Sequence, residues 1–299
     1  LLEAAAGIDA AEGHARQAKA WPAPVVGIER EDFNGSGLYH GSALAQTTLS
    51  ISEPLEIGGP RKARIDASRA NVSAAEAQRA QTRVELGYDL ALAYAAAEAA
   101  AARTALLTQD LDRAREDVRS ARALVDAGKE GELRAVQAEA AAAGALAELE
   151  AAKAEAVGAL ARLSALVGAR DPFDGVQPSL LRAATRRTVS TGDIPVPPQV
   201  VTAQAQRTTA ERRVLVEQKR AIPVPSFTLG RRHLAGADED VWVAGISIPL
   251  PIFDRNRGDI AAARAELRAA EARLDAARLD RKSTRLNSSH VALSRMPSS

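Results

Sequence analysis

Two stretches of the chain alternate between apolar and polar residues, which is the pattern of a β-strand with two different faces. In the first stretch, Ala45, Thr47, Leu49 and Ile51 oppose Gln46, Thr48, Ser50 and Ser52. In the second, Trp242, Ala244, Ile246, Ile248 and Leu250 oppose Val241, Val243, Gly245 and Ser247. A run of about ten residues is long enough to cross a bilayer within a β-barrel. The pattern also fits a soluble hairpin with one face on a core, and the alternation alone leaves both interpretations open.

Long helices are predicted on either side of a reversal at residues 128–132. Residues 61–127 contain no proline, and apolar residues there step by four and three, as in a coiled coil. This seam consists of Leu107, Leu111, Ala114, Val118, Ala121 and Val125. Gly128 and Gly131 supply the backbone freedom for the reversal, and a returning helix is predicted over residues 132–167. Its predicted seam is Leu146, Leu149, Ala156, Leu160, Leu163 and Val167.

The two alternating stretches belong to an internal repeat. The segment that begins at Ile51 matches, without a gap, the segment that begins 195 residues later at Ile246. A second match relates Lys19 to Arg220, which lies 201 residues later. We expect each half to run helix, strand, loop, strand, helix, with a loop about six residues longer in the first half, because loops accept insertions and paired strands do not.

Each repeat predicts a stiff junction where a strand passes into a helix. Proline cannot donate a hydrogen bond to a sheet, so Pro54 and Pro249 end the strand pairing. Asp254 or Asn256 is expected to cap the helix that follows. The residues assigned to the two junctions are Pro54, Gly58, Gly59, Pro249, Pro251, Asp254, Asn256 and Gly258.

Composition and charge exclude several classes of function. Hydrophobic residues make up 46% of the chain and aromatic residues 3%, which favours closely packed helices over a thick core. The net charge of +1 gives no field that would favour nucleic acid, so no nucleic-acid partner is expected. The chain contains no cysteine, which excludes disulfides and thiol chemistry. The most apolar helical windows contain charged residues, so we expect no membrane-spanning helix.

The sequence contains no pattern typical of an enzyme or a cofactor site. The four histidines stand far apart, and acidic residues lie at helical spacings beside Arg and Lys, as surface pairs do. Motifs for nucleotide binding, zinc hydrolysis and serine catalysis are missing. We therefore predict no catalytic, cofactor-binding or metal-binding residues.

The repeated junction, the wording "GISIPLPIFDRNRGDIAAARAEL", the strand "PVPSFTLG" and the reversal "AGKEGELRAVQAEA" together resemble the TolC-type outer-membrane efflux proteins. The form "PLPIFDRNRG" is similar to the cobalt-zinc-cadmium resistance branch of this family. The resemblance implies a mostly α fold with four β-strands, in which long antiparallel coiled-coil helices join two β-hairpins in a duplicated repeat. It also implies a homotrimer whose copies each give four strands to one barrel in the outer membrane of a Gram-negative bacterium, above a helical tunnel in the periplasm.

In function, the resemblance implies the channel subunit of a tripartite pump, a passive conduit for heavy-metal cations or small toxic compounds. Its partners would be a periplasmic adaptor and a proton-driven pump in the inner membrane. The polar strand face, Gln46, Thr48, Ser50 and Ser52, would line the lumen, and the adaptor would dock at the tip formed by Gly128, Lys129, Glu130, Gly131 and Glu132. The alternative function is a periplasmic adaptor or another coiled-coil scaffold without pore activity.

These observations divide the chain into eight segments. They are a helix at 1–21, a β-hairpin at 22–56, a helical hairpin at 57–168, a linker or equatorial segment at 169–198, a helix at 199–221, a second β-hairpin at 222–252, the start of a second long helix at 253–279, and a tail at 280–299. Compared with the family pattern, the chain reads as a truncated fragment that begins within a helix. The stretch "DRKSTRLNSSH" resembles a translated sequencing adapter, so the tail is predicted to be non-native, with an ordinary polar tail as the alternative.

Overall fold

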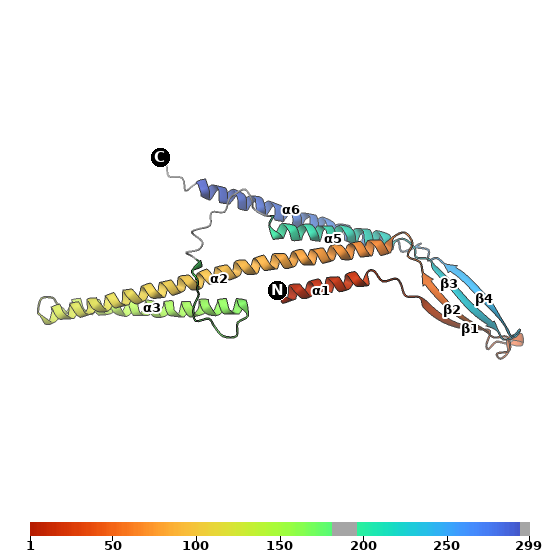
Figure 1. Ribbon diagram of the computed structural model, residues 1–299, viewed down its shortest axis with the longest axis horizontal. Helices are drawn as coiled ribbons and strands as arrows, with labels where there is room; N and C mark the ends of the chain where they lie inside the picture. Colours follow the sequence, from red (N-terminus) through yellow and green to blue (C-terminus); the bar gives the residue numbers. More distant parts are fainter. Residues whose placement is uncertain (181–195, 294–299) are drawn as a thin grey trace. The chain divides into compact units, whose positions relative to one another are not determined.

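The computed structural model describes residues 1–180 and 196–293, with side chains described up to residue 280 (Figure 1). Contacts divide the chain into two units, Leu1–Thr82 with Pro195–Ser299, and Arg83–Ile194. The first unit holds the four strands and three of the helices: α1 (Leu2–Gln17), β1 (Val25–Glu31), the 3-10 turn η1 (Gly37–Tyr39), β2 (Gln46–Pro54), α5 (Pro198–Arg220), β3 (Ser226–Leu234), β4 (Glu239–Ser247) and α6 (Arg257–Leu293). Helix α2 (Pro60–Asp126) belongs to both units, and α3 (Glu132–Val167) belongs to the second. The mostly helical fold with four strands is therefore confirmed.

The strands form one antiparallel sheet in the order β1-β2-β3-β4 (Figure 1). Val25 pairs with Ser52 in the first hairpin, and Ser226 pairs with Ser247 in the second. Ser226 lies 201 residues after Val25, and Ser247 lies 195 residues after Ser52, which are the two spacings of the sequence repeat. The two hairpins therefore share one register, and the duplication read from the sequence is also a duplication of structure.

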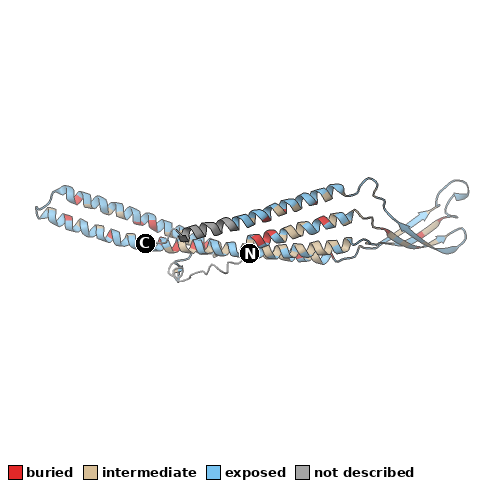
Figure 2. Ribbon diagram, turned by 90° about the horizontal axis from the view of Figure 1, so that it is seen from above, coloured by how far each residue is buried: buried red, intermediate tan, exposed pale blue. Residues whose placement is uncertain are grey.

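In the second unit, α3 returns along α2 as an antiparallel hairpin. Ala93 and Ala97 of α2 pack against Leu163 of α3 in a small apolar cluster. Ion pairs between Arg103 and Glu155, at 3.1 Å, and between Arg122 and Glu139, at 2.6 Å, join the helices farther along. Figure 2 shows that the few buried residues are spaced along the helices and are surrounded by exposed ones.

The predicted seam is correct on α2 and partly wrong on α3. All six seam residues of α2 are buried or half-buried, whereas Leu146 and Val167 of α3 are 43% and 49% exposed. The buried positions beside them are Leu149, Ala152 and Leu163. Leu149 and Leu163 were predicted, whereas Ala152 is a small residue that a search for large apolar side chains passes over. Alanine lets two helix backbones approach closely.

In the first unit, α5 packs against α6 and α2. Val200 and Ala203 of α5 form an apolar cluster with Leu274 of α6. The Thr202 hydroxyl donates to the backbone oxygen of Ala77 in α2 at 3.2 Å. These contacts hold the helix that enters the second hairpin against the helices that leave each hairpin.

The expectation of no membrane-spanning helix is not met in full. Among the described residues, α2 contains one window of 18 residues with a mean hydropathy of 1.3, and 11% of that window is buried. Alanine has a positive hydropathy, so an alanine-rich helix can have this mean hydropathy although it contains charged residues. One such helix is weak evidence for a membrane span.

Two predicted segments extend beyond what the structure describes. The linker at 169–198 includes residues 181–195, which lie outside the described residues. Helix α6 continues past residue 279 to Leu293. A helix can form over a sequence of any origin, so its continuation leaves open whether the tail is native.

Candidate functional site

One face of the sheet is apolar and open to its surroundings. Residues that are opposite each other in the register share a face, and alternate residues along each strand return to it. On this face each of the following side chains is at least 40% exposed: Val26, Ile28, Leu49, Ile51, Phe227, Leu229, Trp242 and Ile246. A contiguous exposed apolar surface of this kind marks contact with a membrane or with another protein.

The other face of the sheet is mainly polar. It brings together the four predicted lumen residues Gln46, Thr48, Ser50 and Ser52 of β2 with Glu29 and Glu31 of β1, Ser226, Thr228 and Arg232 of β3, and Ser247 of β4. Val25, Val241 and Val243 also lie on this face, so its polarity is not uniform. The Thr228 hydroxyl donates to the Ser52 hydroxyl at 3.0 Å, which links the two central strands.

Arg232 is the centre of the polar face. Its Nε donates to Thr48 Oγ1 at 2.9 Å, and its Nη1 donates to Gln46 Oε1 at 3.1 Å. Its Nη2 lies 3.0 Å from Glu31 Oε2, a buried atom that is not aligned for a hydrogen bond, so this contact is an ion pair. One guanidinium thus ties β1, β2 and β3 together, and Thr48 beneath it is only 6% exposed.

Charged residues close the apolar face at the hairpin end of the sheet. Arg231 Nη2 lies 2.5 Å from Asp240 Oδ2, and His233 Nδ1 lies 3.4 Å from Asp240 Oδ1. Arg30 lies on the same face, two residues beyond Ile28 along β1. The apolar band therefore ends in a charged border, as expected where a membrane-facing surface meets water.

The first strand-to-helix junction depends on glycine and proline. Pro54 is the last residue of β2, and the backbone N–H of Leu55 donates to Pro225 O at 2.7 Å. Gly58 and Gly59 follow with φ angles of +81° and +85°, which side chains rarely allow. A Cβ on Gly58 would lie 3.1 Å from the side chain of Ile222. The sharp turn into α2, which begins at Pro60, therefore requires glycine at residue 58.

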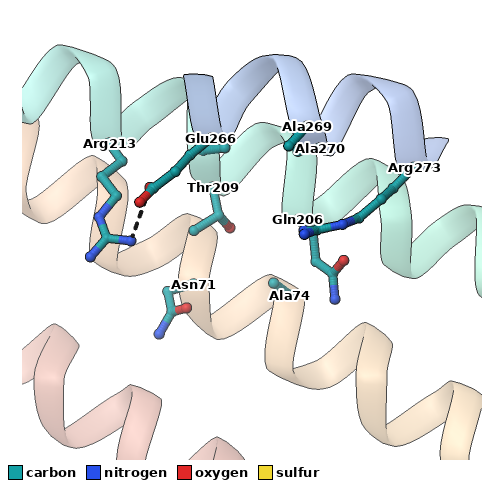
Figure 3. A pocket seen from close by; sticks show the side chains of 10 residues that line it. Asn71, Ala74, Gln206, Thr209, Arg213, Glu266, Ala269, Ala270 and Arg273 are labelled. Carbon is teal, nitrogen blue, oxygen red and sulfur yellow. Dashed lines mark hydrogen bonds and ion pairs between the residues drawn. The ribbon is translucent and has the colours of Figure 1, made fainter. Parts of the chain in front are cut away.

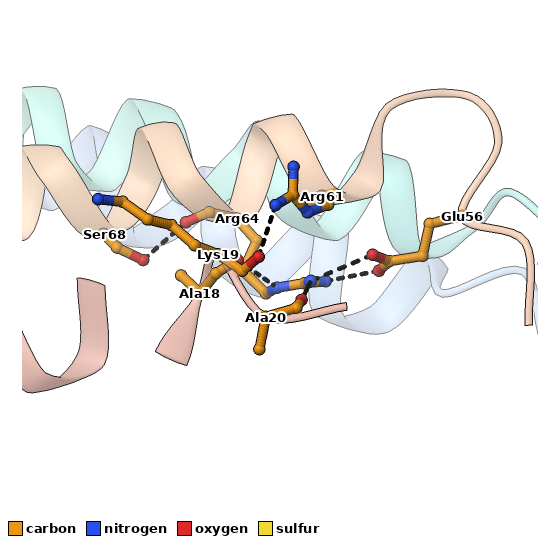
Figure 4. A network of polar contacts seen from close by, with 7 residues as sticks. All are labelled: Ala18, Lys19, Ala20, Glu56, Arg61, Arg64 and Ser68. Carbon is orange, nitrogen blue, oxygen red and sulfur yellow. Dashed lines mark hydrogen bonds and ion pairs between the residues drawn. The ribbon is translucent and has the colours of Figure 1, made fainter. Parts of the chain in front are cut away.

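Two arginines of α2 hold the chain that leaves α1 (Figure 4). Arg64 donates to Ala18 O at 3.2 Å, to Ala20 O at 3.2 Å, and to both carboxylate oxygens of Glu56 at 2.6 and 3.2 Å. The hydrogen bonds and charge of Glu56 raise the pKa of Arg64 above its usual value. Arg61 donates to Lys19 O at 2.6 Å, and its guanidinium lies 4.4 Å from the ring centre of Trp21.

At the second junction, an asparagine shapes the turn into the helix. Asn256 immediately precedes α6, has a φ of +55°, and its carbonyl accepts from Ile260 N, so it occupies the N-cap position. Its side chain reaches across to α5, where Nδ2 donates to Glu217 O at 2.8 Å. The Asp254 carboxylate accepts the Asn256 N–H at 2.8 Å. Of the two predicted capping residues, Asn256 therefore takes the position and Asp254 fixes its backbone.

Corresponding backbone bonds relate the two junctions. The N–H of Ile57 donates to Leu55 O at 2.7 Å, and 195 residues later the N–H of Ile252 donates to Leu250 O at 2.8 Å. Pro249 and Pro251 flank the acceptor Leu250 beyond the end of β4, and Gly258 is the second residue of α6. The repeat therefore extends from the strands into the turns.

The reversal between α2 and α3 forms the tip of the helical hairpin. Gly128 has a φ of +69°, and the N–H groups of Gly128 and Lys129 donate to Val125 O and Leu124 O, both at 2.9 Å. Gly131 directly precedes Glu132, the first residue of α3. All five predicted tip residues are exposed. The tip offers charged side chains on a short, well-defined turn.

The described part of the chain shows no concentration of reactive groups. A shallow groove of about 450 Å³ between α2, α5 and α6 is lined by Asn71, Gln206, Thr209, Arg273 and alanines, with Arg213 paired to Glu266 at 3.4 Å (Figure 3). Residues 1–180 and 196–280 contain no group of three or more His, Asp or Glu side chains placed to hold a metal ion.

Reasoning from the sequence missed the arginines at the centre of these arrangements. Arg232, Arg61 and Arg64 were not singled out, and neither were the partners Glu31 and Glu56. The predicted strand "PVPSFTLG" ends at Gly230, so Arg232 lies beyond it. The partners of Arg64 are backbone carbonyls, which no sequence pattern reveals.

Comparisons with known proteins agree with this geometry. A family model described as "Outer membrane efflux protein" matches residues 1–169. The chain is 41% identical over 285 residues to the nickel-cobalt-cadmium resistance protein NccC of Alcaligenes xylosoxydans xylosoxydans, covering 95% of this chain and 65% of that protein. It is 40% identical over 280 residues to the nickel and cobalt resistance protein CnrC of Cupriavidus metallidurans, covering 94% and 67%. The chain thus spans about two thirds of the length of these relatives.

The fold also resembles that of CusC, which has been solved as a protein that forms a transmembrane channel. The TM-score is 0.71, with 18% identity, 98% of this chain covered and 74% of that chain. At this identity the likeness concerns the fold alone. The family model matches more than half of the chain, and the chain is also similar in sequence to the metal resistance proteins. These two findings show that the chain belongs to the outer membrane efflux protein family.

Proposed function

We propose that the protein is the channel subunit of a tripartite efflux pump and that it exports divalent heavy-metal cations as a passive conduit. The observation that carries this proposal is the sheet with one exposed apolar face and one polar face. Such a sheet can place its apolar face against lipid and its polar face against water, which is the arrangement of a water-filled transmembrane barrel.

The free edges of this sheet support the homotrimer that the family resemblance implies. In lipid, an unpaired strand edge leaves backbone N–H and C=O groups without partners, at a cost of several kcal/mol per group. Among the described residues, β1 and β4 each lack a neighbour on one side. Four strands are too few to close a barrel, so copies of the chain supply the remaining strands, and three copies make a twelve-stranded barrel.

The helical hairpin and its tip suit a partner in the periplasm. The tip residues 128–132 are exposed and include Lys129, Glu130 and Glu132. We assign to them the docking of a periplasmic adaptor that links the channel to a proton-driven pump in the inner membrane. The energy for transport then comes from the pump, and the channel needs neither catalytic residues nor a cofactor.

The cargo assignment rests on the relatives. NccC and CnrC are named for resistance to nickel and cobalt, and NccC also to cadmium. A channel need not coordinate its cargo, and the polar face offers hydrogen-bonding groups and carboxylates past which hydrated cations can move. Three acidic residues on that face, Glu29, Glu31 and Glu239, outnumber the one arginine.

The test is conductance of the protein expressed from its complete gene and reconstituted in planar bilayers. We expect pores that pass cations, together with loss of nickel and cobalt resistance in cells when the gene is deleted. A folded protein that gives silent bilayers and fractionates with the inner membrane would contradict the proposal and favour the alternative, a periplasmic adaptor or scaffold.

Exchanging Lys129 and Glu130 for residues of opposite charge tests the proposed docking role of the tip, since metal resistance should fall while conductance stays unchanged.

A further inference from the structure

We infer that the hairpin end of the apolar face binds the phosphate groups of an anionic lipid in the outer leaflet of the membrane. The residues assigned to this site, here called the basic border, are Arg30, Thr47, Arg231 and His233. This inference rests on the proposed function, because it takes the apolar face to lie against lipid. The helices join the strands at the end of the sheet away from the hairpin turns (Figure 1). With the helices in the periplasm, the hairpin turns therefore reach the outer leaflet.

The register of the strands brings the four residues of the basic border together. Arg30, Thr47 and His233 lie opposite one another on β1, β2 and β3. Arg231 lies on the same face, two residues before His233 and opposite Trp242 of β4. The border therefore combines two guanidinium groups with a hydroxyl and an imidazole, all of which can donate hydrogen bonds.

Arg30 is the free cation of this border. Its side chain is exposed, and it makes no hydrogen bond or ion pair in the part of the chain with described side chains. Its neighbours Glu29 and Glu31 lie on the opposite face of β1, where Glu31 pairs with Arg232. The Arg30 guanidinium is thus available to an anion, and its planar fork of donors fits the oxygen atoms of a phosphate group.

The carboxylates at this end of the sheet lie on the side of β4. Asp240 Oδ2 lies 2.5 Å from Arg231 Nη2, and Asp240 Oδ1 lies 3.4 Å from His233 Nδ1. In the turn, Asp238 Oδ1 lies 4.0 Å from His233 Nε2. The side chains of Arg231 and Asp240 are 64% and 38% exposed, so water weakens their ion pair. Asp240 therefore competes with a phosphate for Arg231 but leaves Arg30 free.

The surroundings of the border favour a lipid over a soluble anion. Trp242, opposite Arg231, is 76% exposed, and tryptophan is enriched where a membrane meets water. Beside the border, Ile28 and Leu49 are 76% and 54% exposed on the same face. An anion with acyl chains can cover these apolar side chains and contact the arginines with one molecule.

The two ends of the apolar face also differ in charge. Near the junctions, the charged residue that the described strands place on this face is Glu53. Near the hairpin turns, the face has Arg30 and Arg231 against Asp240. Basic residues beside an anionic leaflet are attracted to it, whereas a carboxylate is repelled. The charges of this face therefore favour anionic lipid at the hairpin end.

Lipid titration of the protein expressed from its complete gene tests this inference. The probe is bisphosphorylated lipid A, added to the purified protein in a neutral detergent, and native mass spectrometry measures the bound fraction. The same lipid without its phosphates is the reference ligand. The test variant is Arg30→Gln with Arg231→Gln. The matched control, Arg113→Gln with Arg115→Gln, removes the same charge from exposed residues of α2.

We expect the wild type to bind phosphorylated lipid A at least about tenfold more tightly than the dephosphorylated lipid. The test variant should lose about tenfold in affinity for phosphorylated lipid A, because one Lys or Arg beside an anionic lipid surface contributes about fivefold and Arg231 is shared with Asp240. The control should bind like the wild type.

A third variant, Asp240→Asn, should act in the opposite direction. It frees Arg231 and His233 from the carboxylate, so the affinity for phosphorylated lipid A should rise about threefold. A gain in affinity cannot come from misfolding, so this variant keeps the inference testable if the double variant does not fold. Far-UV circular dichroism shows which variants are folded.

Four results would overturn the inference. Equal affinity of the wild type for the two lipids would show that the phosphates are not recognised. Equal losses in the test and control variants would show attraction by net charge alone, and an unchanged affinity of Asp240→Asn would show that the border does not bind the lipid. Displacement of the lipid by an equal concentration of inorganic phosphate would assign the border to free phosphate.

Conductance of the same preparations separates the inference from the proposed function. If the wild type forms conducting pores and any of these four results appears, only the lipid site is wrong. If the folded wild type is silent in planar bilayers, the proposed function fails, and the lipid site fails with it.

Discussion

Replacing Arg64 should reveal how far one side chain fixes the start of the long helix to the chain that enters the sheet. Arg64 makes four hydrogen bonds, two to the Glu56 carboxylate and two to the carbonyls of Ala18 and Ala20. The Glu56 side chain is 8% exposed and that of Arg64 is 38% exposed. Arg64→Ala would therefore leave a nearly buried carboxylate and two carbonyl groups without this donor.

The magnitude follows from these contacts. Breaking a buried ion pair by removing one partner costs about 3 to 5 kcal/mol, and the partial exposure of Arg64 reduces this figure. We expect Arg64→Ala to lower the free energy of unfolding by about 2 to 3 kcal/mol. Arg64→Lys keeps the charge but loses the forked geometry, so a loss of about 1 kcal/mol is expected. The double variant Arg64→Ala with Glu56→Gln should recover part of the loss, because it removes the unpaired charge.

The assay is guanidinium chloride unfolding in detergent, followed by far-UV circular dichroism, with Arg79→Ala on the exposed side of α2 as the control. Since the pKa of Arg64 is raised, its contribution is fully present below its unfolded pKa and is lost only at very alkaline pH. The difference between wild type and Arg64→Ala should thus not change between about pH 7 and about pH 10. A change in stability no larger than that of Arg79→Ala would refute the assignment of Arg64 as a structural clamp.

Three further substitutions test the junction and the two sheet faces. Gly58→Ala should destabilise the protein by about 1 to 2 kcal/mol, because residue 58 has a positive φ and the side chain of Ile222 lies close by. The control Gly87→Ala lies inside α2, where a Cβ has no atom within 4 Å, and should be neutral or stabilising by up to about 1 kcal/mol. Unfolding titrations compare the two variants. Leu49→Lys on the apolar face should reduce the yield of protein in the outer membrane, because a lysine at the bilayer midplane costs about 2 to 4 kcal/mol. Ser50→Lys on the polar face should leave the yield unchanged. Equal losses of the two variants from quantified membrane fractions would contradict the face assignment. Arg232→Met should increase the preference of the proposed pore for cations, because it removes the arginine from a face that keeps its carboxylates. The reversal potential in a salt gradient measures this preference, and the same value for the variant and the wild type would contradict the prediction.

Membership of the outer membrane efflux protein family confirms the outer-membrane location that the resemblance implied. It also supports the proposal that the alternating stretches are membrane strands. Period two with one apolar face fits a soluble hairpin as well as a membrane strand. The alternation predicted the two faces, and the proposed membrane environment rests on the family and on the exposure of residues such as Leu49 and Trp242 in the structure.

The sequence by itself determined the parts of the protein that depend on local periodicity. Alternation with period two defined the faces of β2 and β4, and the stepping of Leu107 and Leu111 defined the seam of α2. The repeat spacings of 195 and 201 residues predicted two equivalent hairpins before any strand pairing was known. The sequence reveals these features because they follow from the geometry of a single helix or strand and depend little on the rest of the chain.

Only the tertiary structure decided the contacts between residues far apart in the chain. Arg232 meets Thr48 across 184 positions, and Arg64 meets Ala18 across 46. The seam of α3 also includes Ala152, because alanine lets α3 approach α2 closely. These choices depend on which surfaces meet, and that is set by the packing and hydrogen bonding of whole elements, for which a single sequence contains no local signal.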